Sequence, residues 1–527
     1  MNNPLPRPVS EEPVEPATAR SLSLIEEAKP PAEIPRNQRI FANRSLRLDQ
    51  IQMVGFDMDY TLALYEQAKM EELSIRATLQ KLIANKGYPD AIRHLTYDPS
   101  LAIRGLVIDM ELGNVFKPDR YGSPGRAMHG RRVLGRAEVA QHYQRERMRL
   151  GDPRYAWIDT LFALPEAVLY LNLVEFFDAF SGPRPPYGQL WRDIRECIDM
   201  AHRDGSIKHL IAADIGLYVN RDPALAEALH RFRSSGKRLF LLTNSEWTYT
   251  DPVMSFLLDG ALPAYPSWRN FFDLVIVSAG KPAFFTEERP FVELDARGEP
   301  LSAKHEGPFV RGHVYAGGNV RAFEDRVGVR GTEVLYIGDH IYGDMLRPRK
   351  SSAWLTAMVL QELETEVKVH DKVTPELQRL DDLERQLRHL DAEISDKQTI
   401  LRSLQRRDGG EAAVPLSNGE APPVRSETTQ DAMALTKLSK KGAREALTQL
   451  RAQLRATMEE HSRLELTLDQ AYNLHWGPLF REGHEISKFG EQVEAYACVY
   501  TSKVSNFRFY SPSRHFRGPR DRMPHER

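Results

Sequence analysis

Between residues 50 and 360 the chain alternates short apolar runs with longer segments of mixed polarity. Four of these runs have the length of a buried strand, and three of the four end in Asp or Asn: "IQMVGFD", "RLFLLTN", "DLVIVSAG" and "EVLYIGD". Helical segments separate the runs, and this pattern predicts an α/β fold with a parallel sheet and crossover helices. Ligands of such sheets bind beyond the carboxyl ends of the strands, so we expect the polar residues there to converge in one crevice.

The first two of these strands are separated by about 180 residues, 57–237, which is far more than a single crossover needs. We therefore expect a large inserted cap, at about residues 66–235, within a catalytic core that spans residues 39–360. Residues 1–38 are rich in Pro, Glu and Ala without an apolar period, and they predict a disordered leader.

Beyond the core, two segments place apolar residues at spacings of three and four. They predict a helical hairpin over residues 361–470, a coiled coil whose helices are joined by a flexible linker at 407–430. Two ordinary amphipathic helices packed on the core are the alternative, and a coiled-coil arm for self-association is the functional interpretation. The positions are Leu380, Leu383, Leu387, Leu390, Ile394, Lys397, Leu401 and Leu404, then Leu447, Leu450, Leu454, Thr457, His461, Leu464 and Leu468.

The last segment, 471–527, is expected to return to the core and to end in a basic tail. Its final stretch, "NFRFYSPSRHFRGPRDRMPHER", interleaves aromatic and basic residues, which is one property of nucleic-acid-binding segments. A solvated or locally docked tail explains the same pattern, and we expect no nucleic-acid partner.

The composition narrows the functional classes. The 527 residues are 41% hydrophobic and 27% charged with a net charge of -2, typical of a soluble globular protein that attracts neither nucleic acid nor membranes. Two cysteines exclude a disulfide framework, and no signal peptide is visible, so a cytoplasmic location is expected. The most apolar stretch, 157–177, carries Asp159, Pro165, Glu166 and Glu175, which predicts a buried helix pair rather than a membrane span.

The chemistry begins with "GFDMDYT", where Asp57 and Asp59 follow an apolar run. Asp57 could attack a phosphorus atom, and Asp59 could protonate the leaving oxygen and later deprotonate water. A hard divalent cation such as Mg²⁺ would offset the repulsion among these groups. A turn after a strand is the ordinary explanation of the same two residues.

Each of the other strand ends is ambiguous when it is considered alone. Thr243 and Asn244 could bind phosphoryl oxygens or cap a helix, and Lys281 could stabilise phosphoryl charge or lie in an exposed loop. Asp339 and Asp344 suit a metal site better than a packed core, and a pair of turn aspartates is the ordinary alternative. Their order along the chain, however, is one that chance rarely supplies.

This series resembles the four motifs of the haloacid dehalogenase-like phosphohydrolases, and the second aspartate of the first motif indicates phosphatases and phosphotransferases. Within that superfamily the chain resembles the cytosolic purine 5′-nucleotidases that prefer IMP and GMP. The resemblance covers residues 38–360, with a weaker continuation at 471–526. It is carried by "GFDMDYTLALY", "RGLVIDMELGNVFKPDRYG", "TNSEWTYTD", "GKPAFF", "GHVYAGGN" and "LYIGDHIYGDML".

The resemblance implies Mg²⁺-dependent hydrolysis of purine nucleoside 5′-monophosphates through an aspartyl-phosphate, with transfer of the phosphoryl group to a nucleoside as a further activity. It makes Asp57 the nucleophile and a metal ligand, and Asp59 the acid/base whose backbone carbonyl also binds the metal. Asp339 becomes the side-chain metal ligand and Asp344 the aspartate that supports it. The implied phosphate-binding residues are Thr243, Asn244, Ser245 and Lys281.

Recognition of the base is implied for "DIRECIDMAHRDGSIK", residues 193–208, through Arg195, Asp199 and Lys208. Arg195, Asp199 and His202 fall at i, i+4 and i+7, on one face of a helix, which makes His202 a further candidate. An exposed Arg/Asp pair at this spacing is usually a surface ion pair worth about 0.3–0.5 kcal/mol. As base-reading groups, Asp199 would accept from a purine ring N–H and Arg195 would donate to a 6-oxo group.

The family resemblance also implies a separate site for a nucleotide effector and a homo-oligomer, a dimer or tetramer. Ala495 stands where relatives have a basic residue, which removes one phosphate contact, and Tyr342 stands where the family motif often has Phe. The effector positions are Arg104, Asn114, Tyr342, Lys350, Gln492 and Tyr496.

Two other functions fit parts of the sequence. The same chemistry could act on a sugar phosphate or another small phosphomonoester. A coiled-coil scaffold on an inactive phosphatase fold is the non-enzymatic alternative, and the intact catalytic series argues against it.

Overall fold

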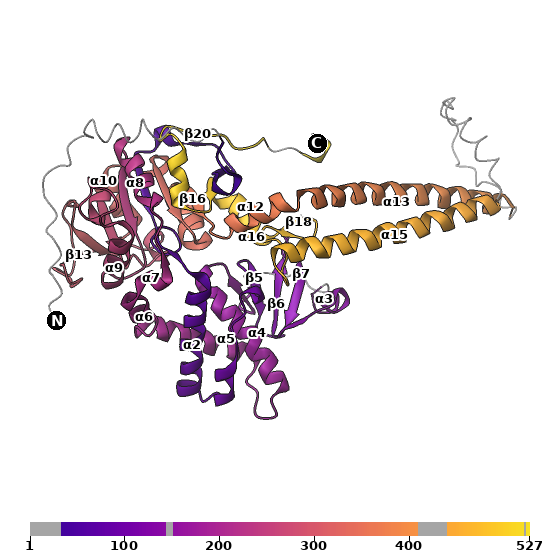
Figure 1. Ribbon diagram of the computed structural model, residues 1–527, viewed down its shortest axis with the longest axis horizontal. Coiled ribbons are helices and arrows are strands. Elements are labelled where there is room, and N and C mark those ends of the chain that lie inside the picture. Colours follow the sequence, from indigo (N-terminus) through magenta and orange to yellow (C-terminus); the bar gives the residue numbers. More distant parts are fainter. Residues whose placement is uncertain (1–32, 144–150, 409–439, 521–522, 527) are drawn as a thin grey trace, which may run out of the picture. The chain divides into compact units, whose positions relative to one another are not determined.

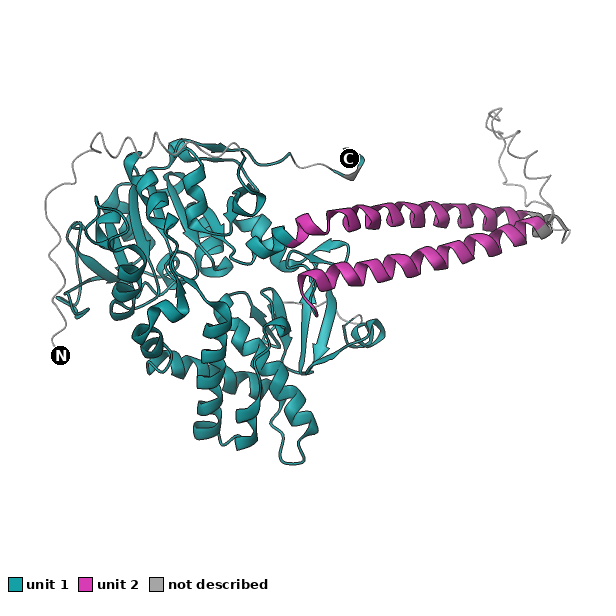
Figure 2. Cartoon of the chain, viewed as in Figure 1, with its two compact units in different colours: residues 1–368, 475–527 teal, residues 369–474 magenta. Residues whose placement is uncertain are grey.

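The structure, a computed structural model, describes residues 33–143, 151–408, 440–520 and 523–526. These residues form two compact units, one of residues 1–368 and 475–527 and the other of residues 369–474 (Figure 2). Most of the predicted leader 1–38 and nearly all of the predicted linker 407–430 lie outside the described residues. Within the described part of the chain, no helix combines the length and apolar character needed to cross a lipid bilayer.

A nine-stranded sheet forms the centre of the first unit (Figure 1). Seven adjacent strands are parallel, and an antiparallel strand closes each edge. In spatial order the strands are β1 (Phe41–Ala42), β19 (Val499–Thr501), β16 (Leu355–Val359), β15 (Val334–Gly338), β3 (Met53–Phe56), β11 (Arg238–Leu242), β12 (Leu274–Val277), β14 (Val314–Gly317) and β13 (Phe291–Leu294). This topology confirms the predicted α/β fold with a parallel sheet.

The register of the three central strands aligns the predicted motifs. Phe56, the last residue of β3, pairs with Leu241 of β11 on one side and with Ile337 of β15 on the other. The polar residues that follow these strands therefore leave the same edge of the sheet. Gly55 is needed within β3 because a Cβ atom there would lie 2.1 Å from the Phe240 ring.

The sheet is buried on both faces, as parallel sheets with crossover helices are. Along β11, Leu239 and Leu241 belong to one apolar cluster, whereas Phe240 and Leu242 belong to another. The helices of this core are α8 (Ala224–Ser234), α9 (Trp247–Leu258), α10 (Val320–Val327), α11 (Arg347–Ser352), α12 (Leu363–Lys372) and α16 (Lys488–Tyr496).

The cap is inserted between two short strands, β4 (Leu64–Tyr65) and β10 (Val219–Asn220), which pair with each other. It contains α2 (Gln67–Lys86), α3 (Arg136–Tyr143), α4 (Leu164–Ala179), α5 (Tyr187–Arg203), α6 (Lys208–Ala213) and α7 (Ile215–Tyr218). It also contains an antiparallel sheet of β5 (Leu106–Asp109), β6 (Asn114–Pro118), β7 (Pro124–His129), β8 (Arg132–Val133) and β9 (Tyr155–Ile158). After β10, α8 contacts β11 and belongs to the core.

One prediction inside the cap is wrong. Residues 157–177 are not a helix pair, since they contain the end of β9, a short 3-10 turn at Leu161–Ala163 and most of α4. Pro165 lies in the first turn of α4, where its missing N–H needs no partner, so it helps to start this helix. The helix is almost entirely buried, which explains why the stretch is so apolar.

The C-terminal segment contributes to the core of the first unit. β19 extends the parallel sheet beside β16, and Trp476 is fully buried. Two smaller pairs complete this unit, β17 (Arg481–Glu482) with β18 (Glu485–Ile486), and β2 (Leu46–Arg47) with β20 (His515–Phe516).

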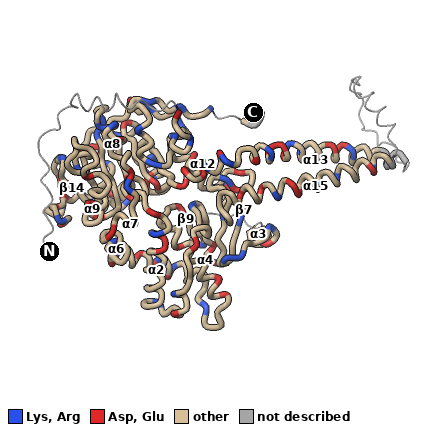
Figure 3. The backbone as a smooth tube through the Cα atoms, viewed as in Figure 1, with Lys and Arg blue, Asp and Glu red and all other residues tan. Residues whose placement is uncertain are grey.

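The second unit consists mainly of two long helices that pack against each other, α13 (Thr374–Asp408) and α15 (Lys440–Tyr472). They run antiparallel, and Lys/Arg and Asp/Glu positions are interspersed along α13 (Figure 3). All heptad positions whose side chains are described are buried or half-buried, and only Leu404 lies outside the described side chains. Most positions between them are exposed, so the apolar seam is closed within one chain.

Candidate active site

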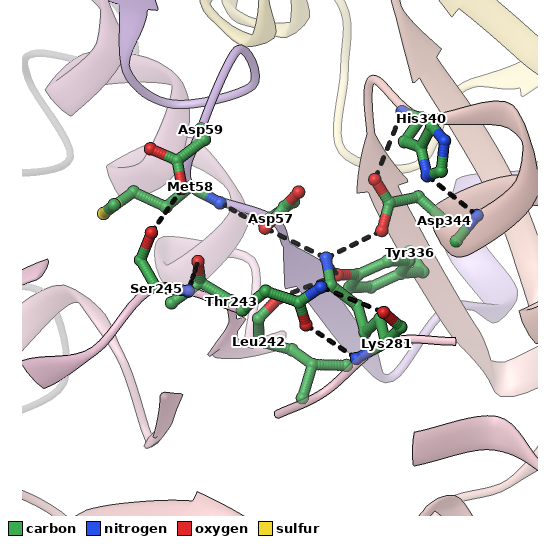
Figure 4. A network of polar contacts seen from close by, with 12 residues as sticks. Asp57, Met58, Asp59, Leu242, Thr243, Ser245, Lys281, Tyr336, His340 and Asp344 are labelled. Atoms are coloured by element: carbon green, nitrogen blue, oxygen red, sulfur yellow. Dashed lines mark hydrogen bonds and ion pairs between the residues drawn. The ribbon is translucent and has the colours of Figure 1, made fainter. Parts of the chain in front are cut away.

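The position of Asp57, the predicted nucleophile, is fixed by the central strand. Asp57 directly follows β3, its backbone N–H donates to the Ile337 carbonyl at 2.9 Å, and its side chain is largely buried. One carboxylate oxygen, Oδ1, accepts from the Met58 backbone N–H at 2.8 Å (Figure 4). The other oxygen is left for a ligand or a reacting atom.

Three buried carboxylates meet at this point. Ligand oxygens of Asp57, Asp339 and Asp344 lie within 4.8 Å of one another. Lys281 reaches between them, with Nζ 2.9 Å from Asp57 Oδ1 and 2.7 Å from Asp344 Oδ1. Gly338 makes room for Asp344, since a Cβ atom at Gly338 would lie 2.5 Å from the Asp344 side chain.

Burial and mutual repulsion shift the ionisation of this cluster. Burial raises the pKa of Asp57 well above its usual range, Asp344 and Asp339 raise it further, and Lys281 opposes them. Burial, together with Asp344, raises the pKa of Asp339 to about 7. Burial alone would lower the pKa of Lys281, but the charges of Asp344 and Asp57 hold it well above its usual range. The lysine therefore stays charged where a phosphoryl group would need it.

Tyr336 and Asn244 help to orient Lys281. Its Nζ donates to the Tyr336 hydroxyl at 2.8 Å, and that hydroxyl donates to the Leu242 carbonyl at 2.9 Å. The Asn244 side chain bonds both the backbone N–H and the carbonyl of Lys281, at 2.6 and 3.0 Å. Asn244 thus fixes the loop that carries the lysine.

Thr243 is fully buried, and its hydroxyl accepts from the Ser245 backbone N–H at 3.1 Å. This contact shapes the turn after β11, whereas Asn244 and Ser245 line the cavity described below. The geometry brings Asn244, Ser245 and Lys281 to the carboxylate cluster and leaves Thr243 behind them.

Asp59 has surroundings of its own. Its Oδ1 accepts from the Tyr65 hydroxyl at 2.5 Å and its Oδ2 from the Ser245 hydroxyl at 2.7 Å. The side chain is not one of the three clustered carboxylates. Tyr60, the next residue, has a φ of 54°, a left-handed conformation that costs on the order of 1 kcal/mol for a non-glycine residue.

A cavity of about 540 Å³ extends from the cluster into the cap, within the 300–1,000 Å³ usual for small-molecule sites. Predicted site residues line both ends. The core contributes Asp57, Asp59, Asn244, Ser245, Lys281, Asp339 and Asp344, and the cap contributes Arg195, Asp199, His202 and Lys208.

At the cap end, Arg195 is held by a buried carboxylate. Its NH1 donates to both oxygens of Glu166 at 2.6 and 2.8 Å, and its NH2 lies 3.8 Å from Asp199. Burial raises the pKa of Glu166 to about 7, against the opposing charge of Arg195. The His202 ring meets the Phe162 ring edge to face, with centroids 6.2 Å apart.

Lys208 lies where the cap approaches the core. Its Nζ is 5.6 Å from the centroid of the Tyr249 ring and 3.9 Å from Glu246. A cation in this position can meet a phosphate or a ribose on the path between the two ends of the cavity.

The carboxylate cluster fits a hard cation. Its ligand atoms are all oxygens, as Mg²⁺ prefers, and the buried Oδ2 of Asp339 accepts no hydrogen bond from the described residues. Asp57 and Asp339 could coordinate directly, while Asp344 is already engaged by Lys281 and by the His340 backbone N–H at 3.2 Å. Arg104 NH1 lies 4.0 Å from Asp339 Oδ2, which is too far for a hydrogen bond, and a buried carboxylate oxygen without a hydrogen bond is unfavourable unless a cation binds it.

The predicted effector residues do not share one set of contacts. The buried Arg104 guanidinium bonds both oxygens of Glu362, at 2.7 and 2.6 Å, and the Asp339 carbonyl at 2.9 Å. Asn114, also buried, bonds Tyr143 at 3.1 Å and His129 at 2.8 Å.

The remaining effector positions lie on α16 and in the segment after β15. Lys350 Nζ lies 6.0 Å from the Tyr496 ring centroid, and Tyr342 is half-exposed beside Arg347. The Oε1 atom of Gln492 is buried and accepts no hydrogen bond from the described residues. Among the side-chain contacts of the described residues, one joins two of the effector positions, that between Lys350 and Tyr496.

Several residues around the site were not singled out from the sequence. Tyr336 lies inside a strand run, Tyr65 ends the first motif segment, and Glu166 sits in an apolar helix. A buried carboxylate within the apolar stretch 157–177 was the one available signal, because a charge in such a place needs a partner. The missed residues are Tyr65, Phe162, Glu166, Tyr249, Tyr336 and His340.

Known proteins are similar to almost the whole chain. A 5′-nucleotidase domain-containing protein of Dictyostelium discoideum is 29% identical over 494 residues, 93% of this chain and 75% of that protein. The 5′-nucleotidase domain-containing protein 2 of rat and that of human are each 29% identical over 499 residues, 92% of this chain and 80% and 85% of theirs.

A solved structure, CbbY from Rhodobacter sphaeroides in complex with phosphate, is 12% identical and covers 59% of this chain and 86% of its own, with a TM-score of 0.22. The model of the 5′ nucleotidase family matches residues 40–527, which includes the hairpin and the C-terminal segment. The chain therefore belongs to the 5′ nucleotidase family, the family that its sequence motifs predicted.

Proposed function

We propose that this chain is a Mg²⁺-dependent phosphohydrolase that cleaves purine nucleoside 5′-monophosphates, IMP and GMP in preference to AMP. The observation that carries the proposal is one cavity with two chemically different ends. Three carboxylates and Lys281 occupy the core end, and Arg195 and Asp199 occupy the cap end. A phosphate group suits the first end and a polar base suits the second.

The residues divide the reaction into two steps. A carboxylate oxygen of Asp57 attacks phosphorus, the bond from phosphorus to the nucleoside O5′ breaks, and the Asp59 carboxyl gives its proton to that oxygen. A water oxygen then attacks the aspartyl-phosphate, its proton passes to Asp59, and the bond from phosphorus to Asp57 breaks. Inorganic phosphate leaves, and both carboxylates return to their initial state.

The charge at the transferred group is met by Lys281 and by the Ser245 and Asn244 segment, with Tyr336 holding the lysine in place. Mg²⁺ bound to Asp57 and Asp339 would add positive charge beside the phosphoryl oxygens. The Asp59 backbone carbonyl is a proposed further ligand, and Asp344 supports the site by fixing Lys281.

Base selection is assigned to α5. Asp199 would accept from the ring N–H that an oxopurine has and adenine lacks, and Arg195 would donate to the 6-oxo group. Glu166 keeps Arg195 pointed into the cavity through its two hydrogen bonds. Phe162 and His202 offer ring surfaces against which a base can pack.

A nucleoside 5′-hydroxyl in place of the attacking water would give phosphotransfer, which we propose as a second outcome of the same intermediate. A sugar phosphate substrate would use the core end of the cavity alone. Regulation by a nucleotide effector and assembly into a homo-oligomer are also proposals, supported by the family resemblance.

The test is phosphate release from IMP, GMP, AMP, UMP and glucose 6-phosphate, each measured with Mg²⁺ and with EDTA. We expect turnover of IMP and GMP to be fastest and to vanish in EDTA, and Asp57→Asn to abolish it without unfolding the protein. Turnover of glucose 6-phosphate alone would contradict the nucleotide assignment.

The base-reading role of α5 has its own variants. Asp199→Asn should lower kcat/KM for IMP by about tenfold or more and leave glucose 6-phosphate unaffected, because only the base contact is lost. Glu196→Gln is the matched control on α5, since Glu196 points to Lys86 at 2.6 Å instead of into the cavity. Equal effects of both variants would show that the helix does not read the base.

A further inference from the structure

Both connections between the core and the cap run through one small ribbon. The chain leaves the core at β4 and returns at β10, where Tyr65 pairs with Val219 in antiparallel register. The Glu66 backbone N–H adds a hydrogen bond to the Tyr218 carbonyl at 2.7 Å. Any movement of the cap relative to the sheet must therefore act on this ribbon.

One side chain of the ribbon touches the proposed acid/base directly. The Tyr65 hydroxyl donates to Asp59 Oδ1 at 2.5 Å, and the Ser245 hydroxyl occupies Oδ2 at 2.7 Å. Both carboxylate oxygens are thus engaged, one from the cap connection and one from the turn after β11. These two bonds select one orientation of the carboxylate.

A second tyrosine fixes the first. The Tyr249 hydroxyl, from α9 of the core, lies 2.9 Å from the Tyr65 hydroxyl, and both tyrosines are buried. A hydroxyl has a single proton, and that of Tyr65 goes to Asp59, so Tyr249 is the donor in this contact. The order of donation is Tyr249 to Tyr65 to Asp59.

We propose that Tyr65 is a positioning residue for Asp59, and that it couples the placement of the cap to proton delivery. The inference rests on the proposed function. In the first step the proton leaves Asp59 for O5′, and the Tyr65 O–H stabilises the carboxylate that this transfer creates. Tyr249 holds Tyr65 in the orientation that the step requires.

The leaving group distinguishes this role from a structural one. The ribose O5′ of a nucleotide leaves as an alkoxide unless it receives a proton, whereas p-nitrophenolate leaves without one. Tyr65→Phe should therefore lower kcat/KM for IMP by about tenfold or more, while p-nitrophenyl phosphate loses less than about threefold. A general loss of folded enzyme would lower both to the same degree.

Tyr60→Phe is the matched control. The Tyr60 ring is buried and packs against the Tyr65 ring, with centroids 5.0 Å apart, and no hydrogen bond joins its hydroxyl to Asp59 in the described structure. This variant should leave the ratio of the two substrates as in the wild type. Tyr249→Phe keeps the hydrogen bond from Tyr65 to Asp59 but removes the one that the Tyr65 oxygen accepts from Tyr249. We therefore expect a smaller loss of kcat/KM, confined to IMP.

The two substrates also distinguish a failure of the Tyr65 inference from a failure of the proposed function. If the wild-type protein hydrolyses IMP and p-nitrophenyl phosphate, equal losses in Tyr65→Phe, or no loss at all, overturn the inference and leave the proposed function standing. If the wild-type protein with Mg²⁺ hydrolyses p-nitrophenyl phosphate but no nucleotide, the proposed function fails and the inference fails with it. A selective loss with IMP in Tyr65→Phe, but not in Tyr60→Phe, supports it.

Discussion

At the scale of single residues, the site holds three buried carboxylates, with Lys281 between two of them and Arg104 NH1 4.0 Å from the third. Lys281 partly neutralises the negative charges of Asp57 and Asp344. The buried Oδ2 of Asp339 accepts no hydrogen bond from the described residues. Buried negative charges in such numbers are unfavourable for folding and are retained where a ligand needs them. If a cation binds here as proposed, the free energy of unfolding should be higher with it than without it.

Asp339→Asn should therefore raise the stability of the protein in EDTA and lower it, relative to the wild type, in Mg²⁺. In EDTA, Asp339→Asn should unfold at a higher temperature than the wild type, because an isosteric amide removes one of the crowded charges. With Mg²⁺ at 100 times its Kd, the wild type should gain about 2.7 kcal/mol and the variant almost nothing. Thermal unfolding of both proteins in EDTA and in Mg²⁺ shows whether the order of their unfolding temperatures reverses. Asp295→Asn, in an exposed turn, serves as the control. A variant that gains as much from Mg²⁺ as the wild type would remove Asp339 from the ligand set.

The sequence was sufficient to predict the core end of the cavity and insufficient for its supporting contacts. Asp57, Lys281 and Asp339 each follow an apolar run, and parallel strands bring their carboxyl ends to one edge. Tyr65 contacts Asp59, six residues before it, and Tyr249, 184 residues after it. Glu166 contacts Arg195, 29 residues after it, and neither an apolar run nor a motif reveals such contacts. Their roles depend on how the cap folds back onto the sheet.

At the scale of elements, α2 of the cap carries a carboxylate that the proposed chemistry does not use. Glu71 is buried, and burial raises its pKa from 4.5 to about 7, although hydrogen bonds from Gln67 and Tyr97 act in the opposite direction. A folded-state pKa above the unfolded value stabilises the protein fully below pH 4.5. That stabilisation declines as the pH rises and is gone above about pH 7.

The Glu71→Gln variant should remove this dependence. Between pH 5 and pH 8 the wild type should lose roughly 2–3 kcal/mol of unfolding free energy through this group, and the variant should not, because glutamine stays neutral. Urea unfolding at four pH values gives the two slopes. Glu72→Gln, the exposed neighbour that pairs with Arg76 at 2.9 Å, should keep the wild-type slope. Parallel slopes for wild type and Glu71→Gln would contradict the prediction.

The hairpin shows what the spacing of apolar residues along a helix can and cannot predict. Spacings of three and four predicted which positions face inward, and the structure buries or half-buries those positions whose side chains it describes. The same pattern does not say whether the seam is closed by a second copy or within one chain. Because α13 and α15 close it with each other, self-association would need another surface.

Removing a seam leucine should therefore loosen only the hairpin. Leu383 is 1% exposed, so Leu383→Ala should destabilise the pair of helices by about 2–5 kcal/mol. Hydrogen exchange should accelerate along α13 and α15 and stay unchanged in the parallel sheet, with phosphatase activity retained. Leu387→Ala, at a half-buried seam position, should have a smaller effect. Faster exchange in the sheet would show that the two compact units fold cooperatively.

At the scale of the whole molecule, the C-terminal segment packs toward β3, the strand that Asp57, the proposed nucleophile, follows. The Phe507 ring lies 5.4 Å from that of Phe232 in α8, which lies 6.3 Å from that of Phe56 at the end of β3. Together with β19, these contacts make residues 499–507 part of the core around the sheet. Sequence resemblance weakens in this segment, so its depth of burial could not be predicted from the motifs.

Phe507→Ala should consequently reduce stability without changing the chemistry. Phe507 is 3% exposed, and deleting its ring should cost about 3–5 kcal/mol and lower the temperature of inactivation, while kcat and KM at 25 °C stay near the wild-type values. Phe509→Ala, two residues on and only half-buried, is the control and should cost much less. Thermal unfolding and steady-state kinetics on the same samples separate stability from catalysis. A drop in kcat for folded Phe507→Ala would mean that the packed rings of Phe507, Phe232 and Phe56 hold Asp57 in position. Equal stability of Phe507→Ala and Phe509→Ala would contradict the prediction that burial of the Phe507 ring stabilises the protein.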